Sequence, residues 1–343
     1  MKSFCIIVLL FTCATSYAEK SNSRGNAFNP KIGINVLFLN QNSSRDKSED
    51  GIKLQETELQ FSSDIDTYFT AKALFAVASE NGTYGIEPEE AYVETIALPY
   101  VTLKIGKSKM PMGKHNQLHA HAFPFINAPL MNEVILGEEG LNETGIGASS
   151  LVPFPWFSEL TLDYTQGENT DLFNSIKKDN KAVIGRFKNL WDLTDSTTLE
   201  IGISSAKGKN TNGSDTSLYG ADLTLKWRPV KGGKYKSFEW ASEFLEKDKK
   251  GVADGKLSGI VSHLKYQIAE RWFVQYRYDY LGLNSSKSIN ASKRHTALLA
   301  FVPSEFSGVR LQYENTNDGQ AKDEKRLSLQ FNISIGAHPA HAY

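Results

Sequence analysis

LSLQFNISI, residues 327–335, alternates an apolar side chain with a polar one at every step. Because successive side chains of a β-strand point to opposite faces, this stretch predicts a strand with one apolar face and one polar face. The same alternation recurs along the chain, at residues 69–77, 160–164, 199–203, 219–228, 271–280 and 309–313. The sequence therefore predicts an all-β protein built from many amphipathic strands.

The predicted strands suit a membrane better than a soluble core. They are about ten residues long, which is the length that a tilted strand needs to cross a bilayer. Trp227, Trp240 and Trp272 lie near strand ends, where an amphipathic ring suits the lipid–water interface. We therefore expect a closed antiparallel transmembrane β-barrel of about 16 strands, within a range of roughly 14 to 18. A large exported soluble β-protein remains the alternative.

Composition excludes two classes of protein. The chain has 343 residues with 38 Lys and Arg against 39 Asp and Glu, so it lacks the basic excess of nucleic-acid-binding proteins. Apolar residues make up only 40% of it, too few for a polytopic helical membrane protein.

The first residues have the features of a secretory signal peptide. Lys2 precedes a short apolar run at 4–11, and small residues surround a cleavage site after Ala18. We expect residues 1–18 to be removed and residues 19–343 to form one outer-membrane barrel. Both cysteines, Cys5 and Cys13, lie in the expected signal peptide, so the mature chain would contain no disulfide.

One long segment interrupts the alternation. Residues 106–147 contain three prolines, Pro111, Pro124 and Pro129, together with several glycines. These residues break regular structure, so we expect the segment not to form strands. It is also partly apolar, unlike the hydrophilic connections elsewhere, and we expect it to fold into the lumen as a long loop that narrows the barrel.

This segment also holds candidate metal ligands. His119 and His121 are two residues apart and would share one side of an extended backbone, whereas His115 and His119 have the spacing of one helical face. Imidazoles suit zinc and related ions, and Glu133 could complete the site. We expect a weakly bound zinc ion at most, with no cofactor required. The alternative is that the histidines are hydrogen-bonded supports of a packed loop. His338 and His341 form a second, less specific pair.

Charged residues on the polar faces would line the pore. The candidates are Lys104, Asp222, Lys226, Arg271 and Arg277. They include positively and negatively charged residues and therefore do not indicate whether the pore prefers anions or cations. The adjacent Ser262 and His263 would point to opposite faces of a strand, so we expect no enzyme.

Several short motifs resemble a known family. They are residues 29–32 (NPKI), 56–59 (ETEL), 64–69 (DIDTYF), 90–95 (EAYVET), the 113–121 pattern GxxNxxHxH and the 338–343 tail HPAHAY. They are similar to porin-like proteobacterial outer-membrane barrels that are described as zinc-regulated, and more distantly to phosphate-selective porins.

The resemblance implies a channel in the Gram-negative outer membrane. Its partners would be outer-membrane lipid and small hydrophilic solutes or ions, with divalent metals such as zinc as candidates and no nucleic acid. Porins often form trimers, so a homotrimer is one assembly that we consider. The alternatives are a structural or adhesive barrel without transport and an anion-selective, phosphate-type porin.

Overall fold

The computed structural model describes residues 30–48, 50–80, 83–174, 180–285, 291–319 and 322–336. The expected signal peptide at 1–18 and the pair His338 and His341 lie outside the described residues. Among the helices of the described ranges, none has both the length and the apolar composition needed to cross a membrane.

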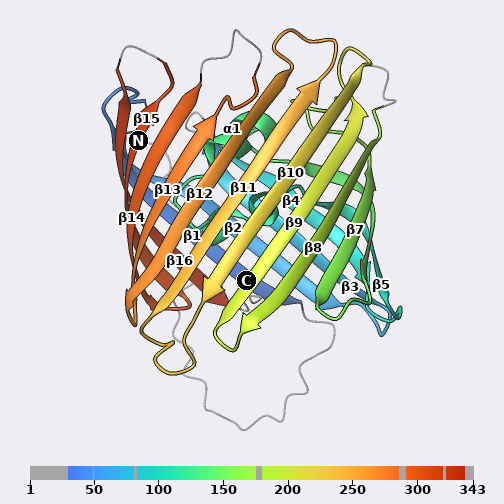
Figure 1. The fold of residues 1–343 in the computed structure, drawn as a ribbon, viewed down its shortest axis with the longest axis horizontal. Coiled ribbons are helices and arrows are strands. Elements are labelled where there is room, and N and C mark those ends of the chain that lie inside the picture. Colours follow the sequence, from blue (N-terminus) through green and yellow to red (C-terminus); the bar gives the residue numbers. More distant parts are fainter. Residues whose placement is uncertain are drawn as a thin grey trace, which may run out of the picture.

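Sixteen strands form a closed antiparallel barrel in which each strand pairs with its neighbours in sequence. The ring closes where β1 pairs with β16, from Gly33 opposite Gly336 to Ser43 opposite Arg326. All strands share a common tilt (Figure 1). This closed ring confirms the predicted fold class. Closure also leaves no strand edge unpaired, as a lipid environment requires.

The elements are, in chain order, β1 Lys31–Ser43, β2 Gly51–Asp64, β3 Phe69–Glu80, β4 Thr83–Thr95, β5 Val101–Lys109, η1 His115–Gln117, η2 Ala120–Ala122, α1 Leu130–Leu136, β6 Asn142–Leu151, β7 Phe157–Thr165, β8 Ala182–Thr194, β9 Thr197–Lys209, β10 Asp215–Trp227, β11 Ser237–Lys249, β12 Lys256–Ala269, β13 Trp272–Leu281, β14 Ser292–Ser304, β15 Ser307–Asn317 and β16 Glu324–Gly336.

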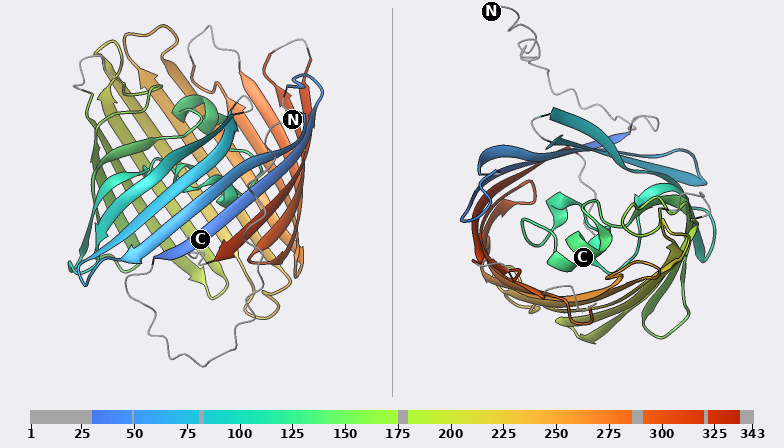
Figure 2. Two further views of the ribbon diagram at one scale, coloured as in Figure 1. Left: turned by 180° about the vertical axis from the view of Figure 1, so that it is seen from behind. Right: turned by 90° about the horizontal axis from the view of Figure 1, so that it is seen from above.

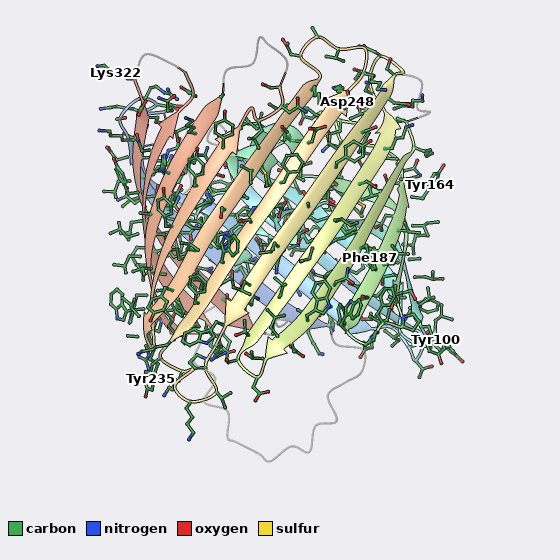
Figure 3. The ribbon with its side chains drawn as sticks, in the orientation of Figure 1. Tyr100, Tyr164, Phe187, Tyr235, Asp248 and Lys322 are labelled. Atoms are coloured by element: carbon green, nitrogen blue, oxygen red, sulfur yellow. The ribbon has the colours of Figure 1, made fainter. Side chains whose placement is uncertain are left out.

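The two faces of the wall differ as the alternation predicts. In β16, Leu327 and Phe331 are 52% and 44% exposed on the outside, whereas Ser328 and Gln330 are 2% and 0% exposed on the inside. Aromatic residues gather at the rim with the short turns, where Trp156 packs against Phe154 and Trp191. Figure 3 shows Tyr100 and Tyr235 at the same rim. An apolar belt bordered by aromatic residues is the exterior that a transmembrane barrel needs.

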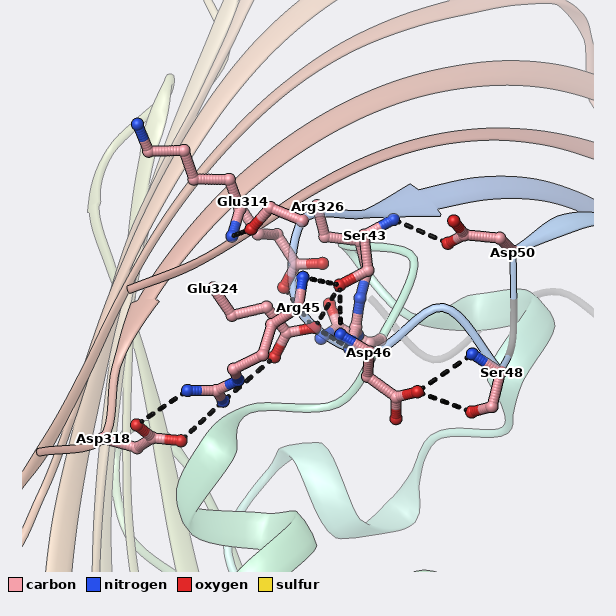
Figure 4. Close-up of polar contacts among 12 residues, drawn as sticks. Ser43, Arg45, Asp46, Ser48, Asp50, Glu314, Asp318, Glu324 and Arg326 are labelled. Atoms are coloured by element: carbon pink, nitrogen blue, oxygen red, sulfur yellow. Dashed lines mark hydrogen bonds and ion pairs between the residues drawn. The ribbon is translucent and has the colours of Figure 1, made fainter. Parts of the chain in front are cut away.

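Ion pairs at the opposite rim hold the seam between the first and last strands. Arg45, which follows β1, binds both carboxylate oxygens of Asp318, at 3.0 and 2.6 Å (Figure 4). Its second partner is Glu324, at 3.4 Å, which also accepts a hydrogen bond from the Ser43 hydroxyl. These contacts tie the β1–β2 connection to the β15–β16 connection.

The long segment is shorter than expected. β5 continues to Lys109 and β6 begins at Asn142, so the expectation of no strand over 106–147 is wrong at both ends. Gly106 and Gly145 face each other within the β5–β6 ladder. A Cβ on Gly106 would lie 2.1 Å from the Ala91 carbonyl oxygen, so this glycine permits a close strand approach and does not break the strand. The non-strand segment is residues 110–141, called the β5–β6 loop below.

The β5–β6 loop lies inside the ring of strands, as the view from above shows (Figure 2). Its helix α1 packs on β11, β12 and β13. Met131, Ile135 and Leu136 of α1 are at most 1% exposed and share one apolar cluster with wall residues such as Leu245 and Val261. A smaller cluster joins Phe125 and Ile126 of the loop to the wall residues Leu39, Leu298 and Ala300. Two apolar patches of the lumen wall therefore hold the loop.

Candidate functional site

A β-bulge in β4 turns two consecutive carboxylates into the lumen. The register with β3 runs from Leu74 opposite Glu90 to Phe75 opposite Pro88 and skips Glu89. A bulge of this kind breaks the strict alternation of side chains. Glu89 and Glu90 are both buried, at 8% and 6% exposure, beneath the β5–β6 loop.

His119 of the loop binds both of these carboxylates. Its Nδ1 lies 2.9 Å from Oε2 of Glu89, and its Nε2 lies 3.1 Å from Oε2 of Glu90. Two wall lysines flank the acids, with Lys72 2.7 Å from Glu90 and Lys109 3.8 Å from Glu89. The imidazole therefore ties the loop to two adjacent residues of one strand.

His121 makes the equivalent contact with β2. Its Nδ1 pairs with Oε2 of Glu58, whose carboxylate is 1% exposed. The rings of His119 and His121 are parallel within 4°, with centroids 6.2 Å apart. The structure thus places the two residues of the predicted His-x-His pair side by side, each on a wall carboxylate.

Three donor groups of this region converge. One ligand atom each from Glu58, Glu89 and His119 lie within 4.8 Å of one another. The sequence reasoning did not select either glutamate as a ligand. Two sequence features could have indicated these ligands: Glu56 and Glu58, which alternate on one face of a strand, and the adjacent acids Glu89 and Glu90. The inward direction of Glu89 could not be predicted, because it depends on a bulge that forms when β4 pairs with β3. We call Glu56, Glu58, Glu89, Glu90, His119 and His121 the His–Glu cluster.

Two other predicted ligands lie elsewhere. His115 belongs to η1, and its backbone N–H donates to Oε2 of Glu243 on β11 at 3.0 Å. The helical spacing of His115 and His119 does not apply, because η1 is a single 3₁₀ turn that ends in extended backbone at Leu118. Glu133 of α1 forms an ion pair with Arg294 of β14 at 3.0 Å. Neither residue belongs to the group of three converging donors formed by Glu58, Glu89 and His119.

The environments of His115 and His119 shift their pKa values in opposite directions. Burial acts to lower the pKa of His119, but its hydrogen bonds with Glu89 and Glu90 prevail and raise this pKa above the ordinary value of 6.5. Burial, together with the charge of Arg277, holds the pKa of His115 well below 6.5. Of these two histidines of the loop, His119 is therefore the one that protonates more readily, and His115 favours the neutral form.

Arginines of β13 and β15 bind the backbone of the same loop. Arg277 Nη1 donates to the Asn127 carbonyl oxygen at 2.8 Å, and Arg310 Nη1 donates to that of Phe123 at 2.6 Å. Asp279 accepts a hydrogen bond from the N–H of Leu130, the first residue of α1, at 2.9 Å. Arg277 is 1% exposed, so it lies on the lumen wall as predicted but is covered by the loop.

Three further residues predicted to line the pore lie in different environments. Asp222 is buried in a bidentate pair with Arg186, at 2.6 and 2.9 Å. Lys226 lies partly buried on the same strand, 3.8 Å from Glu239. Arg271 is exposed in the turn before β13, so its prediction as a wall residue is wrong: the strand begins at Trp272, one residue later than the alternation suggested.

Among the cavities beside the loop, two lie toward opposite ends of the barrel. The larger, about 770 Å³, lies toward the rim of Ser48, and its ionisable lining is Lys53, Glu138, Glu314 and Arg326. The smaller, about 170 Å³, lies toward the short turns, and its ionisable lining is Glu94, Lys104, Lys109, Glu159 and Asp163. Lys104 thus faces the lumen as predicted. The open polar space of the barrel lies on both sides of the loop.

Comparisons with known proteins support the fold. No family model matches the sequence. An uncharacterized protein of Aquifex aeolicus is 29% identical over 340 residues, covering 85% of this chain and 70% of that protein. The anion-selective porin of Comamonas acidovorans superposes with a TM-score of 0.61 at 10% identity, covering 89% of this chain and 98% of that one. OmpF of Salmonella typhi, in complex with daunomycin, gives 0.59 at 10% identity and coverages of 90% and 98%. The architecture is that of outer-membrane porins.

Proposed function

We propose that this protein is a porin-like channel of the Gram-negative outer membrane that admits small hydrophilic solutes. The observation that carries the proposal is a closed barrel with an apolar exterior and polar cavities on both sides of an inward loop. An apolar exterior suits a lipid environment, and a polar lumen suits water and ions. Export would use the signal peptide expected at residues 1–18. No enzymatic activity is part of the proposal.

The charge of the smaller cavity favours cations. Glu94, Glu159 and Asp163 face Lys104 and Lys109 there, so acids outnumber bases. Rings of acidic side chains favour cation passage in other channels. Divalent metal ions such as zinc are therefore the finer proposal for the solute. The resemblance to zinc-regulated barrels supports the same choice, and an anion-selective pore is the alternative.

A homotrimer is the assembly that we propose. One of the similar solved structures is described as the trimer form of OmpT of Vibrio cholerae. In such an assembly, part of the apolar exterior would contact a neighbouring copy where a monomer would contact lipid.

Planar-bilayer recording of the refolded mature chain tests the channel. We expect stable single-channel steps, a reversal potential of cation-selective sign in asymmetric KCl, and a several-fold larger conductance when a short Gly-Ser linker replaces residues 115–138. Heat-shifted mobility in SDS gels serves as the control for barrel assembly. An assembled barrel without conductance would overturn the proposal in favour of a structural barrel, and an anion-selective reversal potential would overturn the choice of cations.

A further inference from the structure

We propose that Glu58, Glu89 and Nδ1 of His119 form a resident binding site for a divalent transition-metal ion, which joins the β5–β6 loop to the barrel wall. The three ligands come from three separate elements, β2, β4 and the loop. Their donor atoms already lie within 4.8 Å of one another. One imidazole and two carboxylates, with water in the remaining position, make a familiar coordination set for zinc and related ions.

The cluster brings four carboxyl groups together beneath the loop. Lys72 and Lys109 pair with Glu90 and Glu89, and His119 and His121 contact Glu89, Glu90 and Glu58. When Nδ1 of His119 binds a metal ion the imidazole is neutral, and a divalent cation then supplies positive charge beside Glu58 and Glu89. That charge lowers the cost of burying the two carboxylates.

One oxygen of a proposed ligand is open to a further partner. Among the described residues, Oε1 of Glu58 is buried and has no N–H donor, and the neighbour of the Glu58 carboxylate on the same strand is the Glu56 carboxyl group. Glu58 as a whole is only 1% exposed. Buried polar atoms are nearly always satisfied, and a cation bound to Glu58 would satisfy this oxygen.

The surrounding groups can orient the ligands. If Nδ1 of His119 binds the ion, the opposite nitrogen, Nε2, is free to donate to Glu90, which lies 3.1 Å away. A carboxylate behind a ligating histidine fixes the ring orientation and raises the basicity of the nitrogen that binds the metal. His121 contacts Oε2 of Glu58 and acts as a positioning residue for that ligand.

Burial distinguishes this site from a permeation site. Glu58, Glu89 and His119 are 1%, 8% and 7% exposed, and they lie between the loop and the wall. An ion there would stay with the protein and would hold the loop, whichever solute crosses the pore. The inference therefore does not depend on the proposed channel function.

Calorimetric titration of ZnCl₂ into the full mature chain in detergent micelles tests the site. The protein is first stripped with a chelator and carries His338→Ala and His341→Ala, which remove the tail pair as competing ligands. We expect one zinc ion per chain. Glu58→Gln and His119→Ala should each weaken binding by at least about tenfold, and His121→Ala by about tenfold through loss of positioning. His295→Ala, which removes an exposed histidine of the outer face, is the matched control and should leave binding unchanged.

A second measurement covers the case in which a variant fails to assemble. Co²⁺ added to the stripped, otherwise unmodified chain should give visible absorption bands of low coordination symmetry, and excess Zn²⁺ should abolish them. Mg²⁺ should not compete, because imidazole is a poor ligand for it. Absence of zinc binding to the assembled parent, or binding unaffected by both Glu58→Gln and His119→Ala, would overturn the proposal. Bilayer conductance plays no part in this test, so its outcome is separate from that of the channel.

Discussion

The β5–β6 loop is held on two sides of the lumen by different chemistry. Toward β2 and β4, its own side chains His119 and His121 bind wall carboxylates. Toward β13 and β15, its backbone carbonyl groups accept hydrogen bonds from Arg277 and Arg310 of the wall. The first side depends on loop side chains, whereas the second combines backbone carbonyl groups with one polar loop side chain: Oδ1 of Asn127 accepts hydrogen bonds from Arg277 at 3.1 Å and from Gln312 at 3.0 Å. The backbone part of this anchor leaves no sign in the sequence of the loop, because every residue has a carbonyl group.

The arginine side should contribute the larger share of stability. Arg277 is buried with Asp279, and its Nε lies 2.8 Å from the Asp279 carboxylate. Arg277→Met would leave that carboxylate and the Asn127 carbonyl oxygen buried without this donor. We expect a loss of about 3–5 kcal/mol in the free energy of unfolding, the usual cost of removing one partner of a buried pair. Denaturant unfolding in lipid vesicles measures it.

An arginine at the rim provides the matched control for this change. Arg45 pairs with Asp318 in an arrangement where both side chains are about one-third exposed, at 31% and 27%. Arg45→Met should cost only about 0–1 kcal/mol, because solvent screens the pair. Equal losses for Arg277→Met and Arg45→Met would contradict the anchoring role assigned to Arg277.

The histidine side should show a smaller effect in chelator-treated protein. His119→Ala removes the contact between the loop and the two glutamates, but Lys72 and Lys109 still pair with Glu90 and Glu89. We expect a loss of about 2 kcal/mol, in the range for a hydrogen bond to a charged group. His295→Ala on the outer face should stay within about 0.5 kcal/mol of the parent, measured by the same unfolding experiment. A loss larger than that of Arg277→Met would reverse the ranking of the two sides.

The smallest and most gradual effect should come from His115. Its pKa is held well below 6.5 in the fold, chiefly by burial and then by the charges of Arg277, Lys109 and His263. As pH falls below about 6.5, the unfolded chain takes up a proton that the folded chain refuses, so the stability present above that pH is progressively lost. The slope should reach up to about 1.4 kcal/mol per pH unit.

His115→Gln isolates this contribution. The difference between parent and variant in the free energy of unfolding, followed from about pH 8 to about pH 5, should shift against the parent as the pH falls. A difference that is constant across this range would mean that His115 does not remain neutral in the folded barrel.

The sequence determined the barrel wall. In β16, the alternation of Leu327, Phe331 and Ile333 with polar residues is a local property, because each strand residue faces the side opposite to its neighbour. The same local logic identified the inward loop as different from its surroundings and paired His119 with His121. It failed at Gly106, where β5 continues as a strand because the glycine permits a close approach of β4, and at Arg271, which precedes the first residue of β13.

Tertiary structure alone decided the chemistry around the loop. Glu58 and Glu89 are more than 25 residues apart in sequence; they lie close together because β2 and β4 both pair with β3, and His119 reaches them because the β5–β6 loop folds inward. Glu89 faces inward because β4 bulges against β3, and a bulge leaves no periodic trace in a single strand. Arg277 and Arg310 bind backbone carbonyl groups of Asn127 and Phe123, which every residue has, so these partners could not be read from residue types. Local alternation specifies the wall, whereas strand pairing and the inward path of the loop specify which distant groups meet in the lumen.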